Sequence, residues 1–178
     1  LLANIGTAAD AHKAAAQDVE GVGLFRSEFL FMNREDLPDE DAQVEAYRAV
    51  IEAMGQDPVT IRVLDWGGEK DMEALAAGVA PMHAGANPAL GLRGLRMLLK
   101  RPELLEVQFA AVLRVAAAHP DGSVRLLLPM VTIPEEVRQA REIYERVARR
   151  LRRRGEKLPE KLPPLGVMIK TPGAALAA

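Results

Sequence analysis

The sequence has no cysteine, few aromatic residues and no long apolar run, and each absence excludes a class of protein. Without cysteine there can be no disulfide framework, no thiolate metal site and no thiol nucleophile, which is compatible with a cytosolic protein. No run of about 18 apolar residues exists, so no segment predicts a transmembrane helix. No signal peptide is recognisable. We therefore expect a cytoplasmic protein that does not bind a membrane.

The charges of the chain are nearly balanced, which argues against a general role in nucleic-acid binding. Lysine and arginine number 23 and acidic residues 25, for a net charge of -2. A nucleic-acid-binding domain is usually strongly basic. The one basic run, Arg149–Arg154, falls where the last turns of a helix are predicted, and cations there oppose the negative end of the helix dipole. We interpret it as solvated helix surface because no aromatic residue is interleaved with it.

The apolar residues form short runs that alternate with amphipathic segments, a pattern typical of parallel βα units. A chain of 178 residues is long enough for one sizeable core, and 49% hydrophobic with only 4% aromatic residues makes that core aliphatic. The predicted strands are residues 1–5, 22–25, 59–64, 124–130 and 165–169. The predicted helices are residues 8–19, 40–54, 91–100, 102–118, 134–154 and 171–178.

Local signals support several of these boundaries. Thr7 is placed to cap the first helix, Gly55 to end the second, and Pro102 to occupy the first position of a later one. Residues 66–89 form a long stretch rich in glycine, alanine and proline. A loop of this length inside a compact domain is usually functional or mobile.

Three arginines occur beside glycine or at the end of a predicted strand. They are Arg26 in Gly-Leu-Phe-Arg-Ser-Glu, Arg62 in Val-Thr-Ile-Arg-Val-Leu-Asp, and Arg93 in Asn-Pro-Ala-Leu-Gly-Leu-Arg. A buried arginine must be paired or ligand-bound, and its planar guanidinium donates bidentate hydrogen bonds to phosphate and carboxylate. The pattern predicts a site for a small polyanion. The residues alone leave an alternative open, namely interior ion pairs of Arg26 with Glu28 or of Arg62 with Asp65.

These segments, together with Leu-Leu-Ala-Asn-Ile-Gly at the start and Gly-Val-Met-Ile-Lys-Thr-Pro near the end, resemble a known family. The likeness is to the phosphoenolpyruvate-binding C-terminal domain of Enzyme I of the bacterial sugar phosphotransferase system, a phosphoenolpyruvate-protein phosphotransferase. Pyruvate phosphate dikinase and phosphoenolpyruvate synthase are related, but Gly-Leu-Phe-Arg-Ser-Glu-Phe-Leu-Phe-Met fits Enzyme I better.

The resemblance implies an α/β fold, the (β/α)8 TIM barrel, of which about five βα units are present. An open doubly wound sheet is the alternative, although no Gly-x-Gly-x-x-Gly turn follows any predicted strand. Residues 1–178 would then be part of one barrel domain, without the phosphohistidine and carrier-protein-binding domains of the family. The chain starts with Leu1 rather than methionine, which fits a piece of a longer protein.

The resemblance also implies an activity, which is transfer of the phosphoryl group of phosphoenolpyruvate to a protein histidine with release of pyruvate. It makes Arg26, Arg62 and Arg93 substrate-binding residues, supported by Asp65 and Lys70. No catalytic residue is expected within this chain, and His12, His83 and His119 are poor candidates for the phosphorylated histidine. The implied partners are phosphoenolpyruvate, a phosphocarrier protein reached through the missing domains, and a second copy of the chain in a homodimer.

Lys170 departs from the family pattern. The resemblance places a glutamate there that binds Mg²⁺, whereas lysine offers only N–H donors and cannot ligate a hard cation. Its ammonium either replaces part of the metal's charge or abolishes metal binding, so we expect no metal ligand in this chain. The substitution keeps two further readings open: a non-catalytic sensor or dimerisation module, and a fragment of the dikinase or synthase branch.

Overall fold

Five parallel strands form a single sheet whose order follows the sequence, β1-β2-β3-β4-β5. The computed structural model describes residues 1–32, 34–66, 91–119 and 123–178. The strands are β1 (Ala3–Ile5), β2 (Val22–Arg26), β3 (Val59–Arg62), β4 (Val124–Leu128) and β5 (Leu165–Val167). All four pairings between neighbouring strands are parallel, as the sequence predicts.

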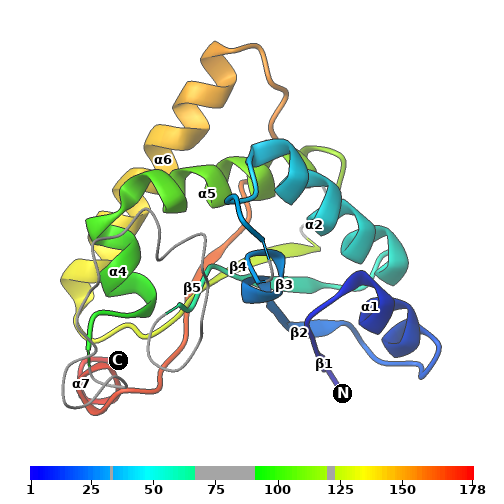
Figure 1. Ribbon diagram of the computed structural model, residues 1–178, viewed down its shortest axis with the longest axis horizontal. Helices are drawn as coiled ribbons and strands as arrows, with labels where there is room; N and C mark the ends of the chain where they lie inside the picture. Colours follow the sequence, from blue (N-terminus) through cyan, green and yellow to red (C-terminus); the bar gives the residue numbers. More distant parts are fainter. Residues whose placement is uncertain (33, 67–90, 120–122) are drawn as a thin grey trace.

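The described part of the chain also contains helices, the longest of which form one layer against this sheet. The helices are α1 (Ala8–Ala15), α2 (Glu40–Met54), α4 (Gly94–Lys100), α5 (Pro102–Ala117), α6 (Pro134–Arg153) and α7 (Pro172–Leu176), with a 3-10 helix η1 (Ser27–Leu30). The long helices pack side by side in the order α1, α2, α5, α6, and Figure 1 shows this layer over one side of the sheet. A doubly wound sheet carries helices on both faces, whereas a barrel carries them only outside. The fold is therefore that of consecutive βα units of a (β/α)8 barrel.

The two faces of the sheet differ in burial because successive side chains of a strand point to opposite faces. On the helix-covered face, Ile61 and its register partner Leu126 are each 1% exposed. On the other face, Thr60 is half-buried and its register partner Arg125 is exposed. Arg62, two residues after Thr60, ends β3 on this second face.

The predicted boundary signals act as expected. The Thr7 hydroxyl accepts the Asp10 N–H, and the Asp10 carboxylate accepts the Thr7 N–H, which together form a capping box at α1. Gly55 ends α2 with a φ of 65°, and Pro102 opens α5.

Several elements are shorter than predicted, for local reasons. The helix predicted over 91–100 begins at Gly94, whose φ of +53° is left-handed and cannot belong to a helix interior. The strand predicted over 124–130 ends at Leu128, because Pro129 has no N–H to donate to the sheet. The helix predicted over 8–19 ends at Ala15, and Asp18 has a φ of 53°. The 3-10 helix η1 was not predicted. Apart from Trp66, the predicted loop 66–89 lies outside the described residues.

Within the described part of the chain, no helix combines the length and the apolar character needed to cross a membrane.

Candidate functional site

Arg26 and Arg62 lie side by side at the carboxyl edge of the sheet. They are the last residues of β2 and β3, and their Cα atoms are register partners. This is the edge at which the active sites of (β/α)8 barrels assemble. Both arginines thus lie at the strand ends where the sequence placed them, and their role in substrate binding stays a prediction.

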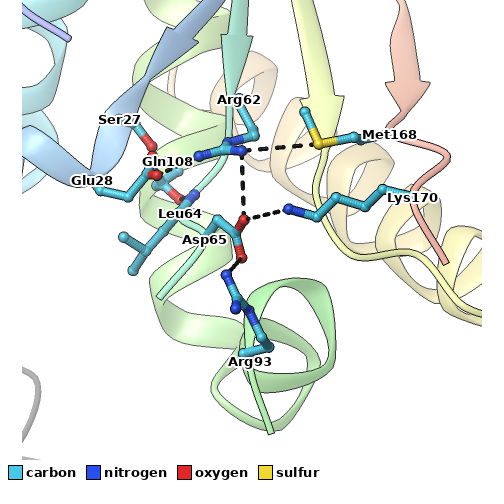
Figure 2. A network of polar contacts seen from close by, with 9 residues as sticks. All are labelled: Ser27, Glu28, Arg62, Leu64, Asp65, Arg93, Gln108, Met168 and Lys170. Atoms are coloured by element: carbon cyan, nitrogen blue, oxygen red, sulfur yellow. Dashed lines mark hydrogen bonds and ion pairs between the residues drawn. The ribbon is translucent and has the colours of Figure 1, made fainter. Parts of the chain in front are cut away.

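A buried carboxylate beyond β3 holds three cations (Figure 2). Asp65 is 1% exposed. Its Oδ2 atom lies 3.5 Å from Nη1 of Arg62 and accepts a hydrogen bond of 3.3 Å from Nζ of Lys170. Its Oδ1 atom accepts a hydrogen bond of 3.2 Å from Nη2 of Arg93. We call these four residues the Asp65 cluster.

The charges of the Asp65 cluster keep its carboxylate ionised. Burial alone would raise the pKa of Asp65, but the positive charges of Lys170, Arg62 and Arg93 outweigh burial and hold that pKa below its usual value. One carboxylate thus faces three cations, so positive charge remains available for an anion at this edge.

Arg62 is also paired with a second buried carboxylate. Its Nη2 donates to Glu28 of η1, and the side chains of Arg62 and Glu28 are only 7% and 1% exposed. The interior ion pair of Arg62 with Asp65, left open by the sequence, is therefore present in the structure. It is part of a larger arrangement in which Arg62 bridges Glu28 and Asp65.

Gln108 of α5 fixes the backbone around this pair. Its Oε1 accepts the Leu64 N–H at 2.9 Å, and its Nε2 donates to the hydroxyls of Ser27 and Tyr47 at 3.2 and 3.1 Å. One buried amide thereby joins η1, α2 and the segment after β3. Sequence reasoning missed Gln108 and Ser27. The available signal was a glutamine within the otherwise apolar stripe of α5, where a buried amide requires hydrogen-bond partners.

The remaining predicted residues lie differently. Arg26 is half-buried, and its guanidinium carbon lies 4.8 Å from the centre of the Phe29 ring. Among the described residues no ion pair joins Arg26 to Asp65, so only Arg62 and Arg93 of the three predicted arginines share the cluster. Lys70 lies outside the described residues, and its role stays a prediction.

A pocket of about 480 Å³ opens beside Arg93 and Lys170, the two outer cations of the cluster. Arg93 and Lys170 line it, together with Thr132 and Arg96. The side chains of Arg93 and Lys170 are 18% and 37% exposed. The volume is within the range of small-molecule sites, so the pocket can hold a compact anion against these two cations.

Gly94 allows α4 to approach the cluster closely enough to place Arg93 there. A Cβ atom on Gly94 would lie 3.0 Å from Oδ1 of Asp65 and 2.8 Å from Cβ of Met130, and its φ is +53°. Its N–H donates to the Trp66 carbonyl at 3.0 Å. Both the space and the backbone conformation therefore require glycine at this position.

Comparison with protein families matches residues 1–178 to the family described as "PEP-utilising enzyme, PEP-binding domain". The chain belongs to this family. The PEP-binding domain is 45% identical over 177 residues to the phosphoenolpyruvate-protein phosphotransferase of Cupriavidus necator. It is 42% identical over 179 residues to that of Haloferax volcanii and 39% over 178 residues to that of Haemophilus influenzae. These alignments cover 99–100% of the chain but only 29–30% of the relatives. The resemblance carried by the motifs is thereby confirmed.

The surroundings of Asp65 and Lys170 in the PEP-binding domain do not fit a Mg²⁺ ion. The described residues contain no group of three or more histidine, cysteine, aspartate or glutamate side chains arranged to hold a metal. At position 170 an ammonium, which has no lone pair to donate, lies 3.3 Å from the Asp65 carboxylate. A divalent cation beside Asp65 would be repelled by Arg62, Arg93 and Lys170 together.

Proposed function

We propose that this PEP-binding domain is the phosphoenolpyruvate-binding part of an Enzyme I-like phosphotransferase of the cytoplasm. In the whole protein, the phosphoryl group of phosphoenolpyruvate would pass to a protein histidine, and pyruvate would be released. The observation that carries the proposal is the convergence of Arg62, Arg93 and Lys170 on one buried carboxylate at the carboxyl edge of the sheet. Phosphoenolpyruvate carries a phosphate and a carboxylate, the two groups that arginine binds best.

The proposed roles follow from exposure and charge. Arg93 and Lys170, the outer cations, donate to the anion in the pocket, and Arg26 adds a guanidinium at the same edge. Arg62 contributes its charge from behind, where Glu28 holds it. Asp65 orients the cations, because a carboxylate would repel a phosphate placed directly against it. Lys70 is proposed as a supporting residue.

The chemistry of the reaction explains why so much positive charge is useful. When the P–O bond of phosphoenolpyruvate breaks, negative charge moves onto the enolate oxygen and spreads over the transferring phosphoryl oxygens. Fixed cations aimed at those oxygens stabilise the transition state more than the ground state. The acceptor histidine, the phosphocarrier protein and the second copy in a homodimer are proposed partners of the whole protein.

Binding can be tested by thermal unfolding. Phosphoenolpyruvate at about 100 times its dissociation constant should stabilise the chain by about 2.7 kcal/mol and raise the melting temperature by about 8 °C. Arg93→Met should lose most of this shift. Arg149→Met, in an ion pair whose arginine side chain is 62% exposed, is the control and should keep it. Equal shifts in all three proteins would remove Arg93 from the site, and no shift in any would refute the proposal.

Lys170 favours one second candidate, a module that binds phosphoenolpyruvate without catalysing transfer, as a sensor or dimerisation unit. Pyruvate release by the intact gene product that carries this chain, followed with lactate dehydrogenase, separates the two. Turnover with a histidine acceptor supports the phosphotransferase, and binding without pyruvate release supports the sensor. The names of the relatives described above favour the phosphotransferase over the dikinase or synthase branch.

A further inference from the structure

Hydrogen bonds fix the backbone on both sides of Lys170. Before it, the Met168 N–H donates to the Leu128 carbonyl at 2.9 Å, which extends the pairing of β5 with β4. After it, the Thr171 hydroxyl donates to the Val131 carbonyl at 2.8 Å and accepts the Ala174 N–H at 3.2 Å. Figure 2 shows the lysine side chain extended from this fixed backbone toward Asp65. Its position is therefore set by the fold.

The ammonium of Lys170 has donors left for a ligand. It carries three N–H groups, and among the described residues its hydrogen bond to Asp65 uses one of them. Its side chain is 37% exposed and lines the pocket of about 480 Å³ beside Arg93. Lys170 and Arg93 bind opposite oxygens of the same carboxylate. Two cations are thus held next to each other at the pocket, as a ligand with two anionic ends requires.

Charge counting shows what the substitution at position 170 achieves. A glutamate with one bound Mg²⁺ would contribute a net charge of +1, since -1 and +2 sum to +1. A single lysine ammonium also contributes +1. The positive charge presented to an anion is therefore the same in the two arrangements, although lysine needs no metal. A charge-assisted hydrogen bond from the ammonium to phosphate or carboxylate supplies the contact that the metal would make.

We propose that the ammonium of Lys170 takes the place of the divalent cation, so that this site binds a small anion bearing both phosphate and carboxylate without metal. The inference rests on the proposed function for its ligand, phosphoenolpyruvate. The site then differs from a metal-dependent one in a measurable way, since a chelator cannot remove a side chain from it.

Titration calorimetry of the chain with phosphoenolpyruvate, once in EDTA and once in Mg²⁺, tests the proposal. The wild-type dissociation constants should agree within about twofold, because the cation is part of the protein. Lys170→Met should weaken binding about tenfold or more in both buffers, as expected for losing about 1.4 kcal/mol or more of charge-assisted contact. Lys170→Glu should bind weakly in EDTA and regain about tenfold in Mg²⁺. Lys161→Met, at an exposed position, is the control and should bind as the wild type does.

The possible outcomes distinguish failure of this inference from failure of the proposed function. Wild-type binding that requires Mg²⁺ would overturn the inference and leave the proposed function standing. Absence of phosphoenolpyruvate binding in both buffers would overturn both. Unchanged binding by Lys170→Met would overturn the inference alone. If Lys170→Glu does not fold, the comparison of wild type with Lys170→Met in the two buffers decides the matter.

Discussion

The cations around Asp65 fall into an inner half, Arg62 with its second partner Glu28, and an outer half, Arg93 and Lys170. The two halves use positively charged side chains for different purposes. In the inner half, the side chain of Arg62 is 7% exposed and is paired with two buried carboxylates, Glu28 and Asp65. In the outer half, the side chains of Arg93 and Lys170 are 18% and 37% exposed, and both donate to Asp65 alone among the ion pairs described above. The inner arginine therefore belongs to the framework, and the outer cations keep capacity for a ligand.

This difference has energetic consequences that can be separated by experiment. Removing one partner of a buried ion pair leaves an uncompensated charge and costs about 3–5 kcal/mol. Exposed pairs contribute about 0–1 kcal/mol because water solvates both charges. Substitutions in the inner half should therefore affect stability first, and substitutions in the outer half should affect binding first.

The largest expected effect is on the inner ion pair. Glu28→Gln should lower the free energy of unfolding by about 3 kcal/mol, because Arg62 would lose one of its two buried counter-charges and keep only Asp65. The measurement is urea unfolding at neutral pH. Glu135→Gln is the matched control, since Glu135 pairs with Arg138 at side-chain exposures of 48% and 68%, and it should cost less than about 1 kcal/mol. Similar losses for both variants would contradict the division into two halves.

The next effect concerns the amide that supports the inner half. Gln108→Leu should cost about 2 kcal/mol, because the buried Leu64 N–H would lose its acceptor and the Ser27 hydroxyl would lose its donor. Gln139→Leu, on the exposed side of α6, provides the control and should change the unfolding free energy by less than about 0.5 kcal/mol. A Gln108 variant as stable as the wild type would show that the amide network adds nothing to the framework.

Asp65 joins the two halves, and its contribution should depend on pH. Its pKa in the folded chain lies below its ordinary value of 3.8, so the unfolded state binds more protons in this range. The stability contributed by the carboxylate is present above the unfolded pKa and is lost as the pH falls through the folded pKa. Asp65→Asn should therefore cost about 1.5 kcal/mol at neutral pH. The difference from wild type should shrink as the pH falls from about 5 to about 3, and a constant difference in urea unfolding would contradict this.

The smallest effect on stability is expected in the outer half. Lys170→Met should change the free energy of unfolding by less than about 0.5 kcal/mol, because the side chain is 37% exposed and its ion pair is screened by water. The same variant should lose phosphoenolpyruvate affinity, as described above. A loss of stability above about 1.5 kcal/mol in urea unfolding would place Lys170 with the framework rather than with the binding residues.

The arrangement of strands and helices was predictable because it follows from local patterns. Short apolar runs gave all five strands, and Thr7, Gly55 and Pro102 marked helix boundaries through their own backbone preferences. The location of Arg26 and Arg62 was also predictable, since strand ends of a parallel sheet meet at one edge. The start of α4 at Gly94 was not, because the close approach of its backbone to Asp65 and Met130, which leaves no room for a Cβ atom, is a tertiary feature.

The sequence raised the ion pair of Arg62 with Asp65 as an alternative, but it did not indicate the other side-chain pairs of the site. Asp65 and Lys170 are 105 positions apart, and nothing in either local segment indicates that they meet. The hydrogen bond between Gln108 and the Leu64 N–H joins residues 44 positions apart, and neither local segment indicates it. Arg26 has the expected location, but its guanidinium lies over Phe29 because η1, which was not predicted, brings that ring beside it. Tertiary geometry decides these contacts.

The order of the strands also determines when the site comes into existence. Each strand pairs with the one that precedes it in the chain, so the sheet can grow by one βα unit at a time while the chain leaves the ribosome. The bond from Lys170 to Asp65 cannot form until the fifth strand lies against the fourth. The anion site is therefore incomplete until β5 is in place, because a nascent chain that stops before β5 contains Asp65, Arg62 and Arg93 but lacks Lys170.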